Sequence, residues 1–199
     1  MSAKTIKRSF DLILSILLLP IWLPAIAICA LLIKLDSQGS IFFLQERIGL
    51  NGTPFQVIKL RTMVPNAEKI GAGLYTEKND PRFTKIGLFL RRFSLDELPQ
   101  FINVITGDMS IVGPRPLPKT IVKRYQNDFD IILKVKPGIT GLAQVEGRNK
   151  LTRKERLSLD KYYVQNWSLI FDVQVLLKTI KVILTGDGQI NYIDREDVD

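Results

Sequence analysis

The stretch RRFSLDELPQFINVITGDMSIVGPRPLP, residues 91–118, places two adjacent carboxylates, Asp96 and Glu97, between arginines in an apolar framework. Ser94 stands three residues before Glu97, which is the spacing of a capping box, and the apolar residues on either side have the spacing of a hydrophobic staple. These signals predict a helix that begins at Ser94. Asp96 would then lie in the first turn, where unpaired N–H groups and the helix dipole stabilise an anion.

An ionised and oriented Asp96 is a candidate nucleophile, and the nearby arginines favour a phosphate-bearing substrate. The alternative is structural: Glu97 caps a helix and Asp96 occupies its first turn, with no further role. Pro99 would fall in the fifth helical position, where it lacks an N–H and crowds the carbonyl four residues earlier. We therefore expect the first turn to be distorted or tightly positioned.

Composition narrows the chemistry that such a site supports. The 199 residues are 46% hydrophobic and 24% charged, which fits one globular domain with an appendage. Histidine is absent, so catalytic triads, Cys-His pairs and histidine metal sites are excluded. General acid and base catalysis would therefore require carboxylates, Lys or Tyr. A bound metal would be a hard cation held by oxygen ligands, and Mg²⁺ fits best. The single cysteine, Cys29, excludes a disulfide framework and favours a reducing compartment for the functional part.

The net charge of +8 predicts anionic partners, which are nucleic acid, acidic lipid head groups or phosphorylated small molecules. The chain shows no aromatic-rich RNA-binding strand signature, no zinc-finger spacing and no basic leucine-zipper region. Nucleic acid is therefore not an expected partner.

Residues 12–33 carry no charge, and a straight helix of that length covers about 33 Å, enough to cross a bilayer. We expect the chain to be membrane-bound. Basic residues flank both ends of the run, which favours a cytoplasmic position for both. This predicts a re-entrant helix hairpin that bends at Pro20 and Pro24, and a kinked spanning helix is the alternative.

Other segments carry weaker signals. Residues 41–63 read as a strand-turn-strand unit around Asn51 and Gly52 that packs beside the site, and residues 63–81 read as a surface loop. Residues 82–93 form either an amphipathic helix at the lipid interface or a core-facing helix. Residues 157–184 read as helical, and we expect their apolar face to be core; it consists of Val173, Leu176, Leu177, Ile180, Ile183 and Leu184. For Tyr162, Tyr163 and Trp167, core packing is favoured over the lipid interface.

Two further arginines are candidate phosphate ligands. Arg115 lies between two prolines that fix the backbone. It is either a bidentate hydrogen-bond donor to a phosphate or an exposed arginine in a stiff turn. Residues 136–148 concentrate turn formers and small residues and end at Arg148. This segment either brings backbone amides and a guanidinium to an anion or is a plain structural loop.

Together these signals predict one domain and one membrane segment. The expected divisions are a membrane segment at 1–36, a cytosolic-face catalytic domain at 37–185 and an acidic tail at 186–199.

The ordered motifs SLDELPQ at 94–100, GDMSIVGPRP at 107–116, KPGITGLAQV at 136–145 and GRN at 147–149 resemble the bacterial sugar transferases that act as small monotopic phosphoglycosyl transferases. The likeness covers nearly the whole chain. It implies an α/β fold in which a compact membrane-associated catalytic domain carries an N-terminal re-entrant membrane helix hairpin and interfacial amphipathic helices. One departure is Leu23-Pro24, where the family often has Ser-Pro at the hairpin bend; Pro20 then supplies the additional bend.

The resemblance implies Mg²⁺-dependent transfer of a sugar 1-phosphate from a UDP-sugar to undecaprenyl phosphate at the cytoplasmic face of the bacterial inner membrane. By position, Asp96 resembles the nucleophile that forms a covalent phosphosugar intermediate and releases UMP. Glu97 resembles its partner, in metal binding or proton transfer. The positions expected to hold phosphates are Arg91, Arg115 and Arg148.

Two other hypotheses remain open at this point. In one, Asp96 and Glu97 form only a metal site and the lipid phosphate attacks directly. In the other, the chain is a membrane-anchored scaffold that binds anionic lipid or glycan enzymes. Membrane lipid is an expected partner, and downstream glycosyltransferases and a second copy of the chain are further candidates.

Overall fold

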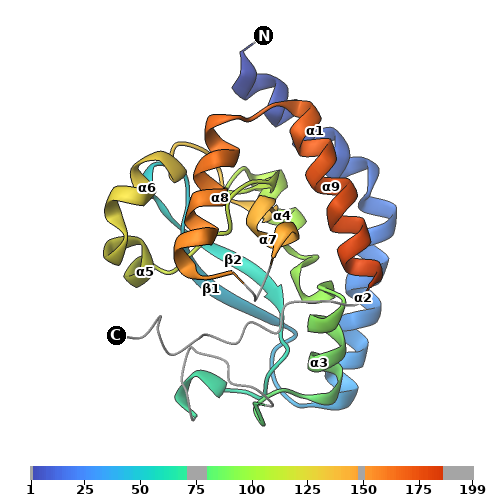
Figure 1. Ribbon diagram of the computed structural model, residues 1–199. Coiled ribbons are helices and arrows are strands. Elements are labelled where there is room, and N and C mark those ends of the chain that lie inside the picture. Colours follow the sequence, from blue (N-terminus) through green and yellow to red (C-terminus); the bar gives the residue numbers. More distant parts are fainter. Residues whose placement is uncertain (1, 71–79, 148–150, 186–199) are drawn as a thin grey trace.

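The computed structural model describes residues 2–70, 80–147 and 151–185, and it is a mixed α/β structure with helices packed around two small sheets (Figure 1). The strands are β1 (Phe42–Ile48), β2 (Pro54–Leu60), β3 (Ser110–Val112) and β4 (Gly138–Thr140). The helices are α1 (Ala3–Leu17), α2 (Leu19–Asp36), α3 (Lys85–Arg92), α4 (Gln100–Thr106), α5 (Lys119–Arg124), α6 (Gln126–Ile132), α7 (Leu142–Glu146), α8 (Arg153–Gln165) and α9 (Leu169–Leu184). The α/β prediction is confirmed, whereas the acidic tail at 186–199 lies outside the described residues.

The predicted strand-turn-strand unit is confirmed. Strands β1 and β2 pair antiparallel from Phe42 opposite Leu60 to Ile48 opposite Pro54. Asn51 and Gly52 turn the chain with positive φ angles of 55° and 79°, a conformation that Asn and Gly adopt at low cost. The second sheet pairs β3 and β4 in parallel. In the predicted surface loop, residues 71–79 lie outside the described part.

The apolar N-terminal run is divided into two helices that meet at Leu18. Pro20 lies in the first turn of α2 and has no N–H to donate to the carbonyl of Ile16, so α1 cannot continue through it. Pro24, the second predicted bend, lies inside α2 without ending it. The break therefore comes at the first proline of the pair, and α2 is the one helix, within the described residues, long and apolar enough to cross a membrane.

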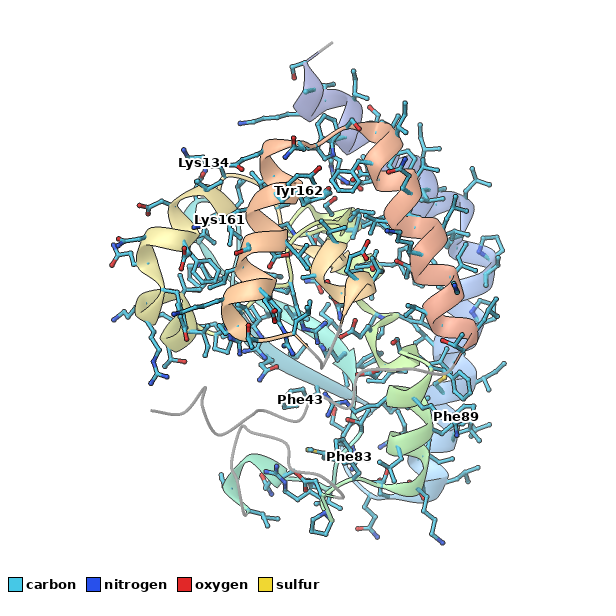
Figure 2. The ribbon with its side chains drawn as sticks, viewed as in Figure 1. Phe43, Phe83, Phe89, Lys134, Lys161 and Tyr162 are labelled. Atoms are coloured by element: carbon cyan, nitrogen blue, oxygen red, sulfur yellow. The ribbon has the colours of Figure 1, made fainter. Side chains whose placement is uncertain are left out.

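Helix α2 has two different apolar faces. Its buried face, Trp22, Ile26, Cys29 and Ile33, packs with Leu60 of β2 and Leu90 of α3. Its outer face is exposed, as Ile28 at 62% illustrates. Helix α3 is likewise divided, because Leu90 is fully buried while Leu88 and Phe89 remain exposed. Figure 2 shows Phe89 on the same side of the molecule as α2.

The predicted helix over 157–184 is in fact two helices, α8 and α9, separated at residues 166–168. Ser168 has an extended backbone and its side chain accepts the N–H of Phe171, so it starts α9 as an N-cap. The expected core face was also wrong. Asp172 and Val175 are buried, whereas Leu177 is 63% exposed; most of the predicted face points outward with it, namely Val173, Ile180, Ile183 and Leu184.

Of the three aromatic residues expected in the core, Tyr163 is buried and Trp167 is partly buried. Tyr162 is exposed (Figure 2), so that part of the prediction was wrong. A helix places neighbouring residues about 100° apart, so adjacent tyrosines cannot both face the core.

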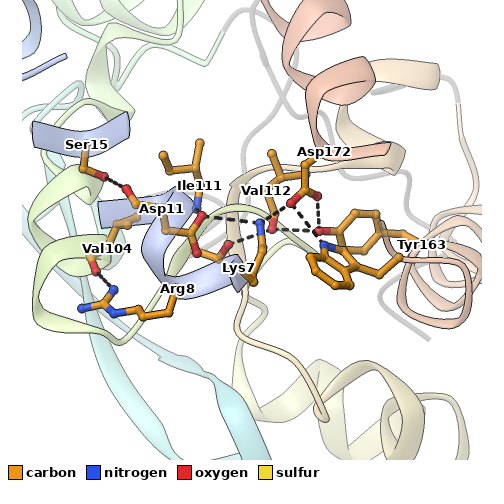
Figure 3. Close-up of polar contacts among 11 residues, drawn as sticks. Lys7, Arg8, Asp11, Ser15, Val104, Ile111, Val112, Tyr163 and Asp172 are labelled. Atoms are coloured by element: carbon orange, nitrogen blue, oxygen red, sulfur yellow. Dashed lines mark hydrogen bonds and ion pairs between the residues drawn. The ribbon is translucent and has the colours of Figure 1, made fainter. Parts of the chain in front are cut away.

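A buried polar network joins α1 to the rest of the fold (Figure 3). Lys7 Nζ lies 2.7 Å from Asp172 Oδ2 and 3.4 Å from Asp11 Oδ1. Asp11 Oδ1 also accepts the backbone N–H of Ile111 at 3.1 Å, which ties α1 directly to β3. Both carboxylates are almost completely buried, so their charge is compensated within the protein by Lys7 and by hydrogen bonds.

The same network continues into α8. Asp172 accepts hydrogen bonds from Tyr163 Oη at 2.7 Å and from Trp167 Nε1 at 3.1 Å. Tyr163 Oη also lies 3.1 Å from the carbonyl oxygen of Val112, the last residue of β3. The strand that leads into Gly113-Pro114-Arg115 is therefore held by α1, α8 and α9 together.

Candidate active site

Asp96 and Glu97 lie in a single 3₁₀ turn, Leu95–Glu97, between α3 and α4. The predicted capping box is wrong. Ser94 has a left-handed backbone, with φ 55°, and its side chain accepts no capping hydrogen bond, whereas a capping box requires an extended residue there. The capping box that the described residues do contain joins Thr152 and Glu155 at the start of α8.

Pro99 does not sit in the fifth position of a helix that begins at Ser94. It directly precedes α4, with φ −62° and ψ −15°, where its missing N–H costs little because a helix start leaves such groups unpaired. The expectation of a distorted first turn is borne out, because residues 95–97 form a 3₁₀ turn that follows a left-handed Ser94.

Glu97 is held by two cations. Its Oε1 lies 2.8 Å from Lys59 Nζ on β2 and 3.0 Å from Arg115 Nη2. Burial alone would raise the pKa of Glu97, but Arg115 and Lys59 outweigh it and lower that pKa to about 2. Glu97 is therefore ionised at neutral pH, and its side chain links the strand hairpin to the loop after β3.

Asp96 has a different environment although it is the next residue. Its side chain is buried, with 6% exposed, and burial raises its pKa against the opposing charges of Lys59 and Arg91. Within the part of the chain that the structure describes, charge rather than a hydrogen bond holds this carboxylate. An oxygen that is oriented but not hydrogen-bonded keeps the electron pair that a nucleophile needs.

Arg91 and Arg115, two of the predicted phosphate ligands, both lie near this pair of carboxylates. Arg91 ends α3 and places its guanidinium 5.0 Å from the centre of the Phe83 ring. Burial lowers the pKa of Arg91, and the negative charge of Asp96 partly offsets that shift. Arg115 holds Glu97 from the turn after β3. The third predicted phosphate ligand, Arg148, lies outside the described residues.

The glycine-rich segment before Arg148 supports the turn that carries Arg115. Gly113 donates its N–H to Thr140 at 2.9 Å, and Gly138 donates to Pro114 at 2.9 Å. A Cβ atom at Gly138 would lie 2.1 Å from the nitrogen of Gly113, so the two backbones meet in a way that only glycine allows. The described part of this segment forms β4 and α7, and its close backbone contacts position the turn that carries Arg115.

Three charged residues of this region were missed by the sequence reasoning. Lys59 and Arg47 lie on the strand hairpin, and the positive charge of Arg115 acts on both. Asp160 lies on α8, where burial raises its pKa to about 7 despite Arg156, Arg153 and Arg115. The signal that could have found Arg47 and Lys59 is the alternation of side chains along a strand. Once β1 and β2 are paired around Asn51-Gly52, Arg47 and Lys59 lie on the same face of the hairpin.

The charges of the site do not balance. The cations are Lys59, Arg91, Arg115 and Arg47, and the carboxylates are Asp96 and Glu97, which leaves a formal excess of two positive charges. A half-buried surplus of this kind favours an anionic ligand, and a diphosphate carries matching charge.

The donor set also fits a magnesium ion that arrives with a phosphate ligand. Both ion pairs of Glu97 use Oε1, so Oε2 and the Asp96 carboxylate are the hard oxygen donors at this position. No cluster of three or more carboxylate, histidine or cysteine ligands occurs among the described residues. Mg²⁺ commonly takes one or two carboxylates together with substrate phosphates, so two carboxylates suffice.

Comparison with known proteins agrees with these features. The family model for bacterial sugar transferases matches residues 2–186. The chain belongs to the bacterial sugar transferase family. Among relatives of this sugar transferase, the UDP-galactose-lipid carrier transferase of Erwinia amylovora is 40% identical over 94% of the chain and 42% of its own length. The exopolysaccharide production protein ExoY of Sinorhizobium fredii is 40% identical over 92% of the chain and 87% of its own length.

A third relative is the undecaprenyl-phosphate glucose phosphotransferase of Komagataeibacter xylinus, which is 41% identical over 88% of the chain and 35% of its own length. The chain thus spans less than half the length of two of these three relatives. Two of these relatives are named for different sugars, galactose and glucose, although their sequence identities to this chain are nearly equal. Sequence identity alone therefore does not select a sugar for this chain.

Proposed function

We propose that this sugar transferase moves a sugar 1-phosphate from a UDP-sugar to undecaprenyl phosphate and releases UMP. The names of the relatives support a lipid-phosphate acceptor, and a UDP-sugar donor agrees with the name of the Erwinia amylovora protein. The observation that carries the proposal is a buried, oriented Asp96 beside an ionised Glu97, within a cluster of cations.

The proposed reaction has two displacement steps. An Asp96 oxygen attacks the sugar-bearing phosphorus, the bond from that phosphorus to the UMP oxygen breaks, and UMP leaves with the electron pair. An oxygen of undecaprenyl phosphate then attacks the same phosphorus and Asp96 leaves as a free carboxylate. Each step forms and breaks one P–O bond, so Asp96 is regenerated.

Cations make these steps feasible because both substrates and the nucleophile are negatively charged. Lys59 and Arg91 offset the charge of Asp96, and Arg115 lies where a phosphate oxygen beside Glu97 would be held. When bound through Asp96 and Glu97, Mg²⁺ would add a further positive charge on the phosphate oxygens. Arg148 is proposed as an additional phosphate ligand on the basis of its motif.

The outer apolar surface supports a membrane location. It includes the exposed faces of α1, α2, α3 and α9, which share one side of the molecule in Figure 1. Exposed apolar side chains on several helices of one side are typical of membrane contact. We propose that this surface seats the protein in the bacterial inner membrane, with the catalytic residues at the cytoplasmic face and with α1 and α2 as the re-entrant segment.

The test is UMP release by detergent-purified protein with a panel of UDP-sugars and Mg²⁺, with and without undecaprenyl phosphate. We expect sustained release that requires Mg²⁺ and the lipid, and an Asp96→Asn variant should lose at least 1,000-fold, on the order of other catalytic nucleophiles. Asp128→Asn, which removes a half-buried carboxylate on α6 that is paired with Lys161 on α8, is the matched control and should retain activity. Full turnover by Asp96→Asn would exclude the nucleophile role and favour direct attack by the lipid phosphate.

A further inference from the structure

Arg47 is a cation of the site that has no acidic partner in the described part of the chain. It lies on β1, half-buried, and its Nη2 donates to Gln45 Oε1 at 2.6 Å. Lys59 and Arg115 are both paired with Glu97, and no such ion pair includes Arg47. Its only hydrogen-bond partner among the described residues is thus a neutral amide.

This arrangement costs stability in the unliganded protein. Burial lowers the pKa of Arg47 to about 10, and the positive charge of Arg115 contributes to that shift. A buried cation next to a second cation is unfavourable, and most proteins have a neutral residue there or pair the cation with a carboxylate. Natural proteins keep such unfavourable charge placements mainly at functional sites. An anion between Arg47 and Arg115 would offset both the desolvation of the Arg47 cation and its repulsion from Arg115.

We propose that Arg47, oriented by Gln45, binds a second phosphate group of the reaction, distinct from the one attacked by Asp96. This inference rests on the proposed function, in which a UDP-sugar brings two phosphates and undecaprenyl phosphate brings another. The shared chemistry is a phosphate with at least two free oxygens, which suits the planar fork of a guanidinium.

Gln45 has a specific role in this arrangement. Its carbonyl oxygen fixes the guanidinium through one N–H group without neutralising the charge, so the remaining N–H groups stay available for phosphate oxygens. A glutamate at position 45 would hold Arg47 equally well but would also cancel its charge. Gln45→Glu should therefore maintain or raise the stability of the protein while it lowers the affinity for phosphate.

The experiment compares wild type with Arg47→Gln and Gln45→Glu, and uses Lys154→Gln, an exposed cation on α8, as the control. Thermal unfolding is measured beside calorimetric binding of two probes, UMP and farnesyl phosphate, a short water-dispersible polyprenyl phosphate. We expect both test variants to unfold at an equal or higher temperature than wild type. At the same time, affinity for one probe should fall by about 10- to 100-fold, the usual effect of losing a charged hydrogen bond.

Loss of UMP affinity would identify the nucleotide phosphate as the ligand, and loss of farnesyl phosphate affinity would identify the acceptor phosphate. Unchanged affinity for both probes would overturn the inference. So would a lower unfolding temperature of Arg47→Gln with unchanged affinity, because that is the result of a purely structural role. Wild type that releases no UMP from any UDP-sugar would instead count against the proposed function itself.

Discussion

At residue scale, Asp96 and Glu97 are neighbours with opposite pKa shifts. Two ion pairs lower the pKa of Glu97, whereas burial raises that of Asp96. Adjacent carboxylates whose environments separate their pKa values commonly have different catalytic roles. Here Glu97 stays charged and positions Lys59 and Arg115, which supports the proposal that Asp96 is the reacting group.

The pH dependence follows from this difference. Asp96 must be ionised to attack, so the first step should become faster as pH rises through its raised pKa. Lys59 is the charge that most strongly opposes that shift, and Lys59→Gln should raise the pKa of Asp96 further. We expect the acidic limb of single-turnover UMP release to move to higher pH in Lys59→Gln and to stay in place in Lys154→Gln. A limb that is unchanged or moves to lower pH would contradict the assignment of Asp96.

The sequence identified Asp96, Glu97, Arg91 and Arg115, but for a partly wrong reason. Ser-x-x-Glu has capping-box spacing, and spacing alone cannot reveal that the glutamate is taken by Lys59, which lies 38 residues earlier in the chain. Long-range ion pairs of this kind depend on how strands and helices are brought together, which local patterns do not encode.

At element scale, α1 is fixed to β3, α8 and α9 by buried charges rather than by apolar contacts alone. Asp11 binds the backbone of β3, and Asp172 binds Lys7 and Tyr163 (Figure 3). Since Val112 leads directly into the turn that carries Arg115, the position of α1 and the geometry of the candidate site are coupled. None of these charges was singled out by the sequence motifs.

Breaking this network should therefore be costly. Asp172→Asn leaves Lys7 opposite a neutral group in a buried setting, and we expect a loss of about 3–5 kcal/mol in the free energy of unfolding. Chemical denaturation in detergent measures it. The control is Asp128→Asn, which breaks the more solvent-accessible pair with Lys161 and should cost about 1 kcal/mol or less. If both variants lost a similarly small part of the free energy of unfolding, the buried network would contribute little to stability.

At the scale of the whole molecule, one side is apolar while the candidate catalytic residues lie inward, between α3, α4 and the strand hairpin. The strand-turn-strand unit was predictable because turn residues and alternation are local signals. The burial of α9 was not predictable, because helical periodicity reports an apolar face without saying whether protein or another apolar phase covers it. Helix α2 presents both a buried and an exposed apolar face.

The apolar side makes a prediction about location. Leu177→Asp on α9 and Ile28→Asp on α2 each place a charge on the exposed apolar surface, where transfer into a bilayer costs about 2.5–3.5 kcal/mol. We expect both variants to float less with liposomes of bacterial lipid than wild type. Ser158→Asp adds the same charge at an exposed position of α8 and should float as wild type does. Equal flotation of all four proteins would remove this surface from the membrane contact.

Peptide mass spectrometry shows directly whether Asp96 is a covalent nucleophile. Purified protein is mixed with the UDP-sugar that supports UMP release, in Mg²⁺ and without undecaprenyl phosphate, and is then quenched and digested. Covalent catalysis by Asp96 should give a mass increase equal to one sugar phosphate on the peptide that contains Asp96, its loss when undecaprenyl phosphate is added, and no such increase in Asp96→Asn. An active enzyme that never carries this mass, or carries it on another residue, would rule out Asp96 as the nucleophile.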